Sequence, residues 1–175
     1  GISAALAKRF ATGKHPTVYE LPAGGRTLVV SGSRSDHSHA QLDWAREHGF
    51  SMVPLSPSDV LSGKIDDKSV AEAVVRSLDR SRRVAIYLER SSGGAAAGAV
   101  DTGERLSSRL ASVAARVLDS TEVNRLVVAG GETSGAVCSA CGFDAFAVGQ
   151  QLSPGVPLCF PLGGSQQVVV LKSGN

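Results

Sequence analysis

Several features that mark particular classes of protein are scarce in this 175-residue chain. It has three cysteines, an odd number, which argues against a framework of disulfide bonds. Its net charge of +2 at pH 7 is too small to indicate a nucleic acid or a membrane surface as partner. The basic run at Arg80–Arg83 is interpreted as a solvated helix end, with nucleic-acid binding as the weaker alternative. We therefore expect no nucleic-acid partner and no membrane partner.

Long hydrophobic runs and a secretory leader are lacking too. No apolar run approaches the roughly 20 residues that span a bilayer. The first ten residues, GISAALAKRF, have no basic segment ahead of an apolar stretch, so they do not resemble a signal peptide. A cytoplasmic location is the resulting expectation.

Cys138 and Cys141 form a C-x-x-C pair, but the other ligands of a zinc site are missing from their neighbourhood. There is no second pair and no suitable histidine nearby. The spacing is also that of one helical turn on a helix of small residues. Structural thiols are favoured, and a redox or metal role is the alternative.

What the chain does have is a hydrophobic content of 42% and a regular alternation of apolar patterns. Its length suffices for one substantial domain. Residues 1–26 are interpreted as a helix fragment followed by a linker rich in proline and glycine, which suggests that something was attached upstream. The alternation begins at Thr27, so residues 27–175 form the predicted domain. Strands are expected at residues 27–31, 51–55, 83–88, 126–129, 145–148, 158–162 and 168–171, and helices at residues 36–48, 66–81, 104–118 and 134–141.

This alternation predicts an α/β fold. Strands that alternate with helices of this length imply right-handed crossovers and a doubly wound, mainly parallel sheet with helices on both faces. The last strands have no helices between them, so an antiparallel edge or hairpin is expected near the C-terminus. Residues 91–103, rich in glycine, alanine and serine, are predicted to form a mobile loop.

Three glycine-bearing polar loops follow predicted strands, and in such sheets ligands bind at the carboxyl ends of the strands. The first loop is SGSRS at residues 31–35, the second is GGETSG at residues 130–135, and the third is KSGN at residues 172–175. Glycine lets the backbone approach a ligand, and the first N–H groups of a following helix are unpaired. Together with hydroxyl groups these features favour binding of phosphate.

Neither standard phosphate fingerprint is present, however. The chain has no G-x-x-x-x-G-K-[ST], and its glycines at 130, 131 and 135 do not fit G-x-G-x-x-G. The alternative interpretation is therefore that these glycines only permit tight turns between strand and helix.

Charged residues in and near the loops have more than one interpretation. Glu132 would repel a polyphosphate, so it either caps its helix, reaches a ribose hydroxyl, or helps to hold Mg²⁺ directly or through water. Lys172 could neutralise a phosphate or be a solvated strand end, and the same alternatives apply to Arg34. His37 and His39 flank a helix start and are interpreted as solvated rather than catalytic.

Three stretches together, VVSGSRSDHSHAQL, VVAGGETSGAV and LGGSQQVVVLKSGN, resemble the carboxy-terminal nucleotide-binding domain of the four-carbon acid sugar kinase family. Some members of that family carried an older label as Hrp-dependent type III effectors. The resemblance runs from about Thr27 to Asn175 and keeps the order of the motifs. It implies phosphorylation of tetronates or 3-oxo-tetronates with ATP. The nucleotide contacts it implies are Ser31 or Ser33, residues 130–134 (Gly130, Gly131, Glu132, Thr133 and Ser134), and Gly174.

The resemblance also implies a two-domain kinase in which a separate amino-terminal domain binds the sugar acid, with residues 1–26 as the end of that missing domain and a linker. That domain would supply the group that orients the attacking hydroxyl, so no catalytic base is assigned here. ATP or ADP with Mg²⁺ is the implied cofactor, and a homo-oligomer is a possible assembly. Gln166 and Gln167 depart from the proline that relatives often place there, which leaves the turn near Gly163 in doubt.

Two other classes of function compete with the kinase. One is a non-enzymatic small-ligand or interaction module of doubly wound fold, in keeping with the effector label. The other is a dehydrogenase domain, which the absent G-x-G-x-x-G disfavours.

Overall fold

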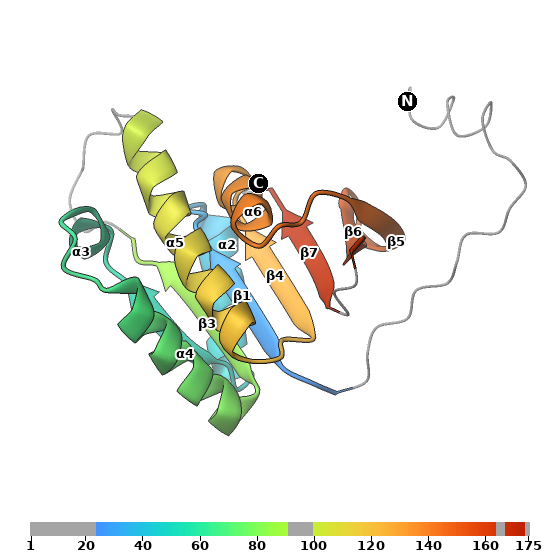
Figure 1. Ribbon diagram of the computed structural model, residues 1–175, viewed down its shortest axis with the longest axis horizontal. Coiled ribbons are helices and arrows are strands. Elements are labelled where there is room, and N and C mark those ends of the chain that lie inside the picture. The colour runs from blue at the N-terminus through green and yellow to red at the C-terminus, as the bar shows by residue number, and fades with distance from the viewer. Residues whose placement is uncertain (1–23, 91–99, 164–166, 174–175) are drawn as a thin grey trace, which may run out of the picture.

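The computed structural model describes residues 24–90, 100–163 and 167–173, and they form one sheet with helices on both faces (Figure 1). The strands are β1 (Thr27–Ser31), β2 (Ser51–Leu55), β3 (Arg83–Leu88), β4 (Arg125–Ala129), β5 (Phe146–Ser153), β6 (Val156–Pro161) and β7 (Val168–Lys172). The helices are α2 (Asp36–Glu47), α3 (Pro57–Leu61), α4 (Asp67–Ser81), α5 (Val100–Ser120) and α6 (Gly131–Ala140).

The sheet has the order β2-β3-β1-β4-β7-β6-β5. The five strands from β2 to β7 pair in parallel, whereas β6 is antiparallel to both β7 and β5. This arrangement confirms the predicted doubly wound, mainly parallel sheet with an antiparallel hairpin near the C-terminus. Gly155 makes the hairpin turn with a positive φ of 79°.

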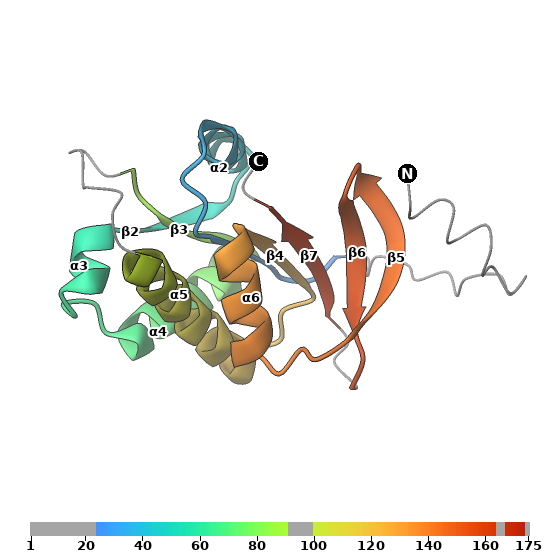
Figure 2. The same ribbon diagram turned by 90° about the horizontal axis from the view of Figure 1, so that it is seen from above.

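The helices are distributed unequally over the two faces of the sheet. Figure 2 shows α2 on one face and α3, α4, α5 and α6 on the other. The larger core lies under α4 and α5, where the fully buried side chains include Leu28, Leu78, Ile86, Leu110 and Leu126. A smaller cluster, Leu42, Ala85 and Tyr87, fills the layer under α2. Burial of a large apolar side chain stabilises the fold by about 1.5–3 kcal/mol, so these two layers hold the helices to the sheet.

Local sequence explains where the predicted helices begin. Ser35 is the N-cap of α2, and its hydroxyl accepts from the Ser38 N–H. Asp66 caps α4 in the same way through the N–H groups of Lys68 and Ser69. The strands at residues 27–31, 51–55 and 83–88 have the predicted bounds.

The largest departures from the predicted local structure are three wrong element bounds and one short helix that was not predicted. Helix α6 begins at residue 131 rather than 134, because Gly130 alone makes the turn out of β4. Helix α5 begins at residue 100, so residues 100–103 are helical and not part of a loop; residues 91–99 lie outside the described residues. The short helix α3, which starts at Pro57 in the favoured first helical position, was not predicted. Strand β5 extends to Ser153, five residues beyond its predicted end.

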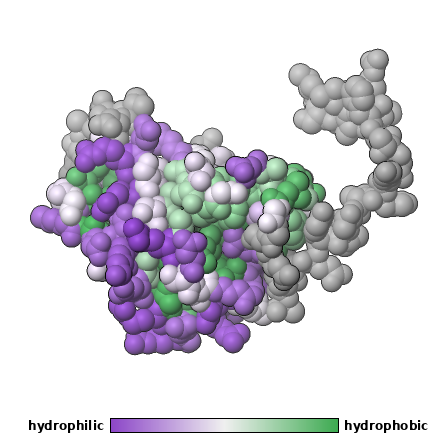
Figure 3. Space-filling model, viewed as in Figure 1, coloured by the Kyte–Doolittle hydropathy of each residue, from purple (hydrophilic) through white to green (hydrophobic). Residues whose placement is uncertain are grey.

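The β5–β6 hairpin carries exposed apolar side chains. Val148 is 66% exposed, Leu152 53% and Leu162 58%. Figure 3 shows the hydrophobic surface at this end of the molecule. Within the part of the chain that is described, no helix is long and apolar enough to cross a membrane.

Candidate functional site

The order of the strands places a topological switch point at the carboxyl end of β1. Strand β1 leads to α2 on one face of the sheet, whereas its neighbours β3 and β4 lead to α5 and α6 on the other face (Figures 1 and 2). In open α/β sheets, ligands bind where adjacent connections leave to opposite faces. The loops predicted to bind a ligand after β1 and β4 therefore meet at the position where the fold itself favours a site.

Gly32 brings the β1–α2 loop against the first turn of α6. A Cβ atom on Gly32 would overlap the hydroxyl oxygen of Thr133 and would lie 3.3 Å from Leu110. The Gly32 N–H donates to the Ala129 carbonyl at 3.0 Å. Thr133 is only 2% exposed, and its hydroxyl lies 3.2 Å from the hydroxyl of Ser107 on α5. The Thr133 side chain thus faces inward and joins the β1–α2 loop to α5 and α6.

Gly130 has a backbone conformation that suits glycine, with φ 114° and ψ 129°. A Cβ atom there would lie 3.2 Å from the backbone nitrogen of Ser33 and 3.3 Å from the Thr133 hydroxyl oxygen. The Gly130 N–H donates to the Lys172 carbonyl at 2.9 Å, which ties the loop after β4 to the end of β7. The carboxyl ends of β1, β4 and β7 are therefore held together at this corner.

The amino-terminal end of α6 lacks a side-chain cap. Its N-cap residue, Gly130, has no side chain, whereas the N-cap residues of α2 and α4 do cap their helices. The first helical bond runs from the Ser134 N–H to the Gly130 carbonyl at 2.8 Å, so the N–H groups of residues 131–133 precede the helical ladder. A Cβ atom on Gly131 would meet no atom within 4 Å. This end of α6 therefore offers N–H groups, a positive dipole end and space to an anion.

Glu132 is exposed, and its carboxylate lies beside the backbone of α5. A Cβ atom on Gly103 would be 2.6 Å from Glu132 Oε2, so glycine at 103 makes room for the carboxylate. A carboxylate in the first turn also stabilises the helix dipole. Glu132 thus acts on the helix dipole without making a cap hydrogen bond among the described residues, while its contact with a ribose or with Mg²⁺ stays a prediction.

A network of serine hydroxyls fixes the loop between β1 and α2. The Ser38 hydroxyl donates to that of Ser33 at 2.8 Å, and the Ser35 hydroxyl lies 3.2 Å from that of Ser33. Ser33 is thus buried and engaged with its own loop, at 7% exposure. Ser31 is buried at 2% exposure, and its hydroxyl has no partner among the described residues. Of the two predicted contacts, Ser33 is already hydrogen-bonded within its loop, whereas the Ser31 hydroxyl can still donate or accept a hydrogen bond to a ligand.

The third predicted loop follows β7. Lys172 ends that strand, and its ammonium group donates to the Ser173 carbonyl at 3.2 Å. Gly174, the predicted contact in this loop, lies outside the described residues. Arg34 in the first loop is exposed. The structure thus brings together the predicted residues of the first two loops and places Lys172 at the same edge.

His39 is buried, which contradicts the interpretation of both histidines as solvated. It is 7% exposed, whereas His37 is exposed as expected. The buried face of α2 consists of Ser38, His39, Leu42 and Ala45, and the i, i+2 spacing of the histidines does not reveal this. Burial lowers the pKa of His39, and so does the positive charge of Arg90, against a smaller opposing effect of the two aspartates on α2.

We predict that the buried His39 makes the fold less stable in mild acid. Its pKa is lower in the folded state than the ordinary value of 6.5, so the unfolded chain takes up a proton first as the pH falls. The stability that the neutral ring supports is complete above pH 6.5 and is lost as the pH falls through the folded-state pKa. The urea midpoint should therefore drop on going from neutral to mildly acidic pH.

The matched variants make this prediction specific. The drop should be smaller in His39→Gln and unchanged in His37→Gln, because only His39 is buried. Asp66 also has a lowered pKa, caused mainly by its hydrogen bonds with Ser69, but it titrates below its ordinary value of 3.8, outside this range. Equal drops in all three proteins would contradict the assignment to His39.

The cysteines have the properties of structural thiols. Burial raises the pKa of the Cys141 thiol to about 11, and it raises the pKa of Cys138 and Cys159 as well. A protonated thiol is neither a good nucleophile nor a metal ligand. Among the described residues, no group of three or more histidine, cysteine or acidic side chains could hold a metal ion.

Comparison with known proteins identifies relatives over nearly the whole chain. A family model described as the nucleotide-binding C-terminal domain matches residues 28–175. The chain is 34% identical to a 3-oxo-isoapionate kinase of Paraburkholderia graminis, with 100% of the chain and 42% of the relative covered. It is 33% identical to a 3-oxo-tetronate kinase of Salmonella typhimurium, with 100% and 43% covered. The chain thus spans less than half the length of these relatives.

Solved structures show the same fold. A Haemophilus influenzae protein superposes with a TM-score of 0.81 at 28% identity, covering 99% of this chain and 43% of that one. A Bordetella bronchiseptica domain of unknown function, crystallised with bound citrate as a domain-swapped dimer, gives a TM-score of 0.69 at 24% identity, covering 87% and 38%. The second likeness supports the fold alone.

Proposed function

Because the chain belongs to the family of nucleotide-binding C-terminal domains, we propose that it is the ATP-binding part of a kinase for four-carbon acid sugars. Both relatives are named as kinases of 3-oxo sugar acids, and the name of one, 3-oxo-tetronate kinase, supports a tetronate or 3-oxo-tetronate as substrate class. The observation that carries the proposal is the uncapped amino-terminal end of α6, which lies at the topological switch point beside β1.

In this proposal the phosphates of ATP or ADP lie against the first turn of α6. The N–H groups of residues 131–133 donate to phosphate oxygens, and the space over Gly131 admits them. The buried Thr133 hydroxyl positions the two loops, so its N–H rather than its side chain faces the ligand. Ser31, Ser33, Ser134 and Gly174 complete the proposed nucleotide contacts.

Phosphoryl transfer needs little covalent chemistry from the protein. It depends on the alignment of the reactants and on neutralisation of charge by Mg²⁺ and cationic groups. Mg²⁺ in such sites keeps several waters and takes one or two carboxylates besides phosphate oxygens, so a cluster of protein ligands is not required. Glu132 is a carboxylate in the first turn of α6, and we propose it as a water-mediated ligand of Mg²⁺. Lys172 stands at the same edge as a cationic group.

The rest of the reaction is assigned to a second domain. Residues 1–26 are proposed as the end of that domain and a linker, and residues 27–175 as the nucleotide-binding domain. The sugar acid and the group that orients its hydroxyl belong to the second domain in this proposal. A cytoplasmic location, where ATP is available, and self-association are parts of the same proposal.

Calorimetric titration with ATP, ADP and NAD tests the function. We expect heat of binding with ATP and ADP, strengthened by Mg²⁺, and none with NAD. Binding of NAD alone would indicate a dehydrogenase domain. Binding of none of the three would favour the non-enzymatic interaction module, for which the exposed apolar residues of the β5–β6 hairpin are the observation in support.

A further inference from the structure

Three buried side-chain atoms in the described ranges have no hydrogen-bond partner: Ser31 Oγ, His39 Nε2 and Arg109 Nε. Arg109 Nε lies 3.1 Å from the Asp67 carboxylate, so its charge is balanced. A buried polar atom without a partner costs about 1–3 kcal/mol, and folded proteins leave few of them. Ser31 and His39 are therefore the two polar groups whose burial the fold itself does not explain.

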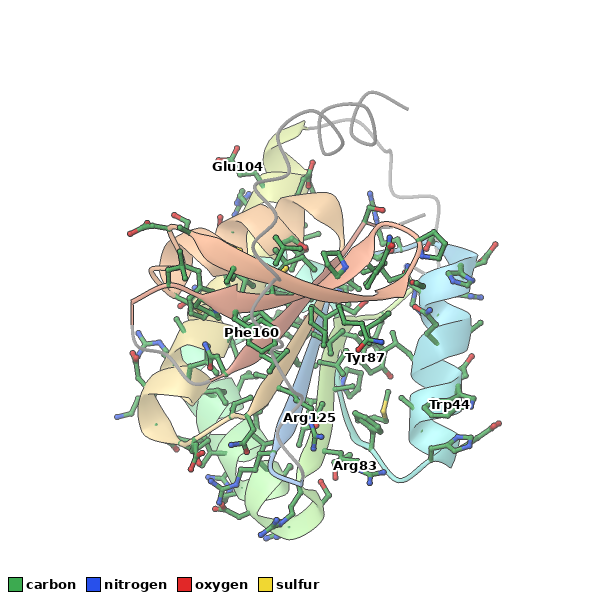
Figure 4. The ribbon with its side chains drawn as sticks, turned by 90° about the vertical axis from the view of Figure 1, so that its right-hand side faces the viewer. Trp44, Arg83, Tyr87, Glu104, Arg125 and Phe160 are labelled. Carbon is green, nitrogen blue, oxygen red and sulfur yellow. The ribbon has the colours of Figure 1, made fainter. Side chains whose placement is uncertain are left out.

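Both groups lie at one end of the layer between α2 and the sheet. Ser31 is on the same face of β1 as Val29, which packs against the cluster of Leu42, Ala85 and Tyr87. His39 lies on the buried face of α2, one turn before Leu42. Tyr87 pairs with Ser31 in register, and Figure 4 shows it between the sheet and α2. The hydroxyl of Ser31 and the ring of His39 thus close this apolar layer at the edge where β1 ends.

A chain of contacts links this end of the layer to α6. His39 follows Ser38, whose hydroxyl donates to that of Ser33 at 2.8 Å. The backbone nitrogen of Ser33 is the nearest atom to a Cβ built on Gly130, at 3.2 Å. Gly130 is the N-cap of α6. The first turn of α2 and the proposed phosphate site at α6 are therefore linked through the β1–α2 loop, at the edge of the sheet where β1 and β4 end.

The charges around His39 are mostly on its own helix and on the segment after β3. Asp36 and Asp43 lie on α2, one turn before and one turn after it, and both favour the charged ring. Arg90 disfavours it, although the guanidinium also pairs with Asp36 at 3.2 Å. Tyr87 on β3 faces the same layer and accepts a hydrogen bond from Arg46 at 3.2 Å. A neutral imidazole retains one donor and one acceptor, so His39 can meet a ligand in either protonation state.

We propose that His39 is a nucleotide-binding residue whose Nε2, together with the Ser31 hydroxyl, contacts an oxygen of the phosphate chain. This inference rests on the proposed function. An anion against Nε2 gives the buried nitrogen a partner and offsets the repulsion between the ring and Arg90. Arg90 is already paired with Asp36, but Arg34 in the β1–α2 loop and Lys172 at the end of β7 add positive charge at this edge, which favours a phosphate there over a neutral group.

The proposal predicts that the affinity for ADP depends on pH through the protonation of His39. A phosphate oxygen beside Nε2 stabilises the protonated ring, so the pKa of His39 rises when ADP binds. Wild-type affinity should then increase relative to His39→Gln as the pH falls from about 8 to about 5. The gain should be about tenfold for each unit by which ADP raises the pKa. ADP itself also takes up a proton in this pH range. Because this affects both proteins equally, it cancels in the ratio of the Kd of His39→Gln to the Kd of the wild-type protein.

The controls use a neighbouring histidine and a ligand without phosphate. His37→Gln alters an exposed histidine two residues away and should keep the wild-type pH profile. The His39 ring signals in a ¹⁵N NMR titration of the wild-type protein should shift to a higher pKa with ADP and stay unmoved with adenosine. Ser31→Ala should lower ADP affinity severalfold at every pH, since a hydroxyl does not titrate in this range.

These measurements distinguish a failure of the proposed nucleotide binding from a failure of the role proposed for His39. If the wild-type protein binds no ADP, the proposed function is wrong and this inference falls with it. If ADP binds but the Kd ratio is constant with pH and the ring signals do not move, the function stands and the role of His39 is refuted. The NMR measurement needs no variant, so it decides the question even if His39→Gln fails to fold.

Discussion

Residues 1–175 alone should bind ADP and yet show no tetronate-dependent turnover. The corner formed by the β1–α2 loop and α6 lies within the described residues, so the nucleotide half of the proposed reaction is present. The chain covers 42% and 43% of the two kinase relatives described above, and we assign the sugar acid to the remainder of their length. Holding two reactants in line contributes on the order of 7–11 kcal/mol, or at least about 10⁵-fold in rate. Without the second domain this contribution is absent, and only slow hydrolysis of ATP by water remains.

A coupled assay of ADP release with a panel of tetronates and 3-oxo-tetronates tests this expectation. The Salmonella typhimurium 3-oxo-tetronate kinase in the same assay is the positive control, because it matches this chain over 43% of its own length. Sugar-dependent turnover by residues 1–175 would refute the assignment of the substrate to a second domain. A chain that binds ADP but stays inactive until the second domain is supplied would support it.

The fold followed from the sequence because two strong local signals agreed with each other. The apolar runs at residues 27–31, 51–55 and 83–88 are short, rich in branched side chains and bounded by polar residues, which are the properties of buried parallel strands. Ser35 and Asp66 then mark helix starts through their side-chain oxygens. With strands and helices fixed in alternation, the right-handed crossover restricts the sheet to few arrangements.

The site followed less completely, because the direction of a side chain depends on packing. The sequence indicated Gly130–Ser134 as one polar loop, but residues 131–134 belong to the first turn of a helix. Within that turn Thr133 points inward to Ser107 and Gly32, while Gly131 and Glu132 are exposed. Composition alone cannot make this distinction, since a serine or threonine in a first turn is compatible with either direction.

His39 was missed for a related reason. A histidine near a helix start is normally solvated, and only the angle of α2 against the sheet shows that residue 39 faces inward and residue 37 outward. One signal was available: His39 precedes the buried Leu42 by three residues, which places it on the apolar stripe of an amphipathic helix.

Replacement of Gly131 by valine should weaken ADP binding by about 1–3 kcal/mol, or roughly tenfold to a hundredfold. The residue with a positive φ in the turn between β4 and α6 is Gly130, not Gly131, so the backbone conformation at residue 131 admits a side chain. Its Cβ would meet no protein atom within 4 Å, so the space that it fills is the space proposed for a phosphate. Glycine is also a poorer helix former than valine, so the free energy of unfolding should not decrease.

The same substitution one turn later is the matched control. Gly135 is also in α6, and a Cβ there meets nothing within 4 Å either. Gly135→Val should therefore match Gly131→Val in its urea midpoint and resemble the wild-type protein in its calorimetric Kd for ADP, because residue 135 lies beyond the unpaired N–H groups of the first turn. A Gly131→Val protein that is folded and binds ADP with unchanged affinity would show that the open end of α6 is not where the phosphates lie. Equal losses of affinity in both variants would place the ligand along the helix rather than at its end, and would equally contradict the proposed site.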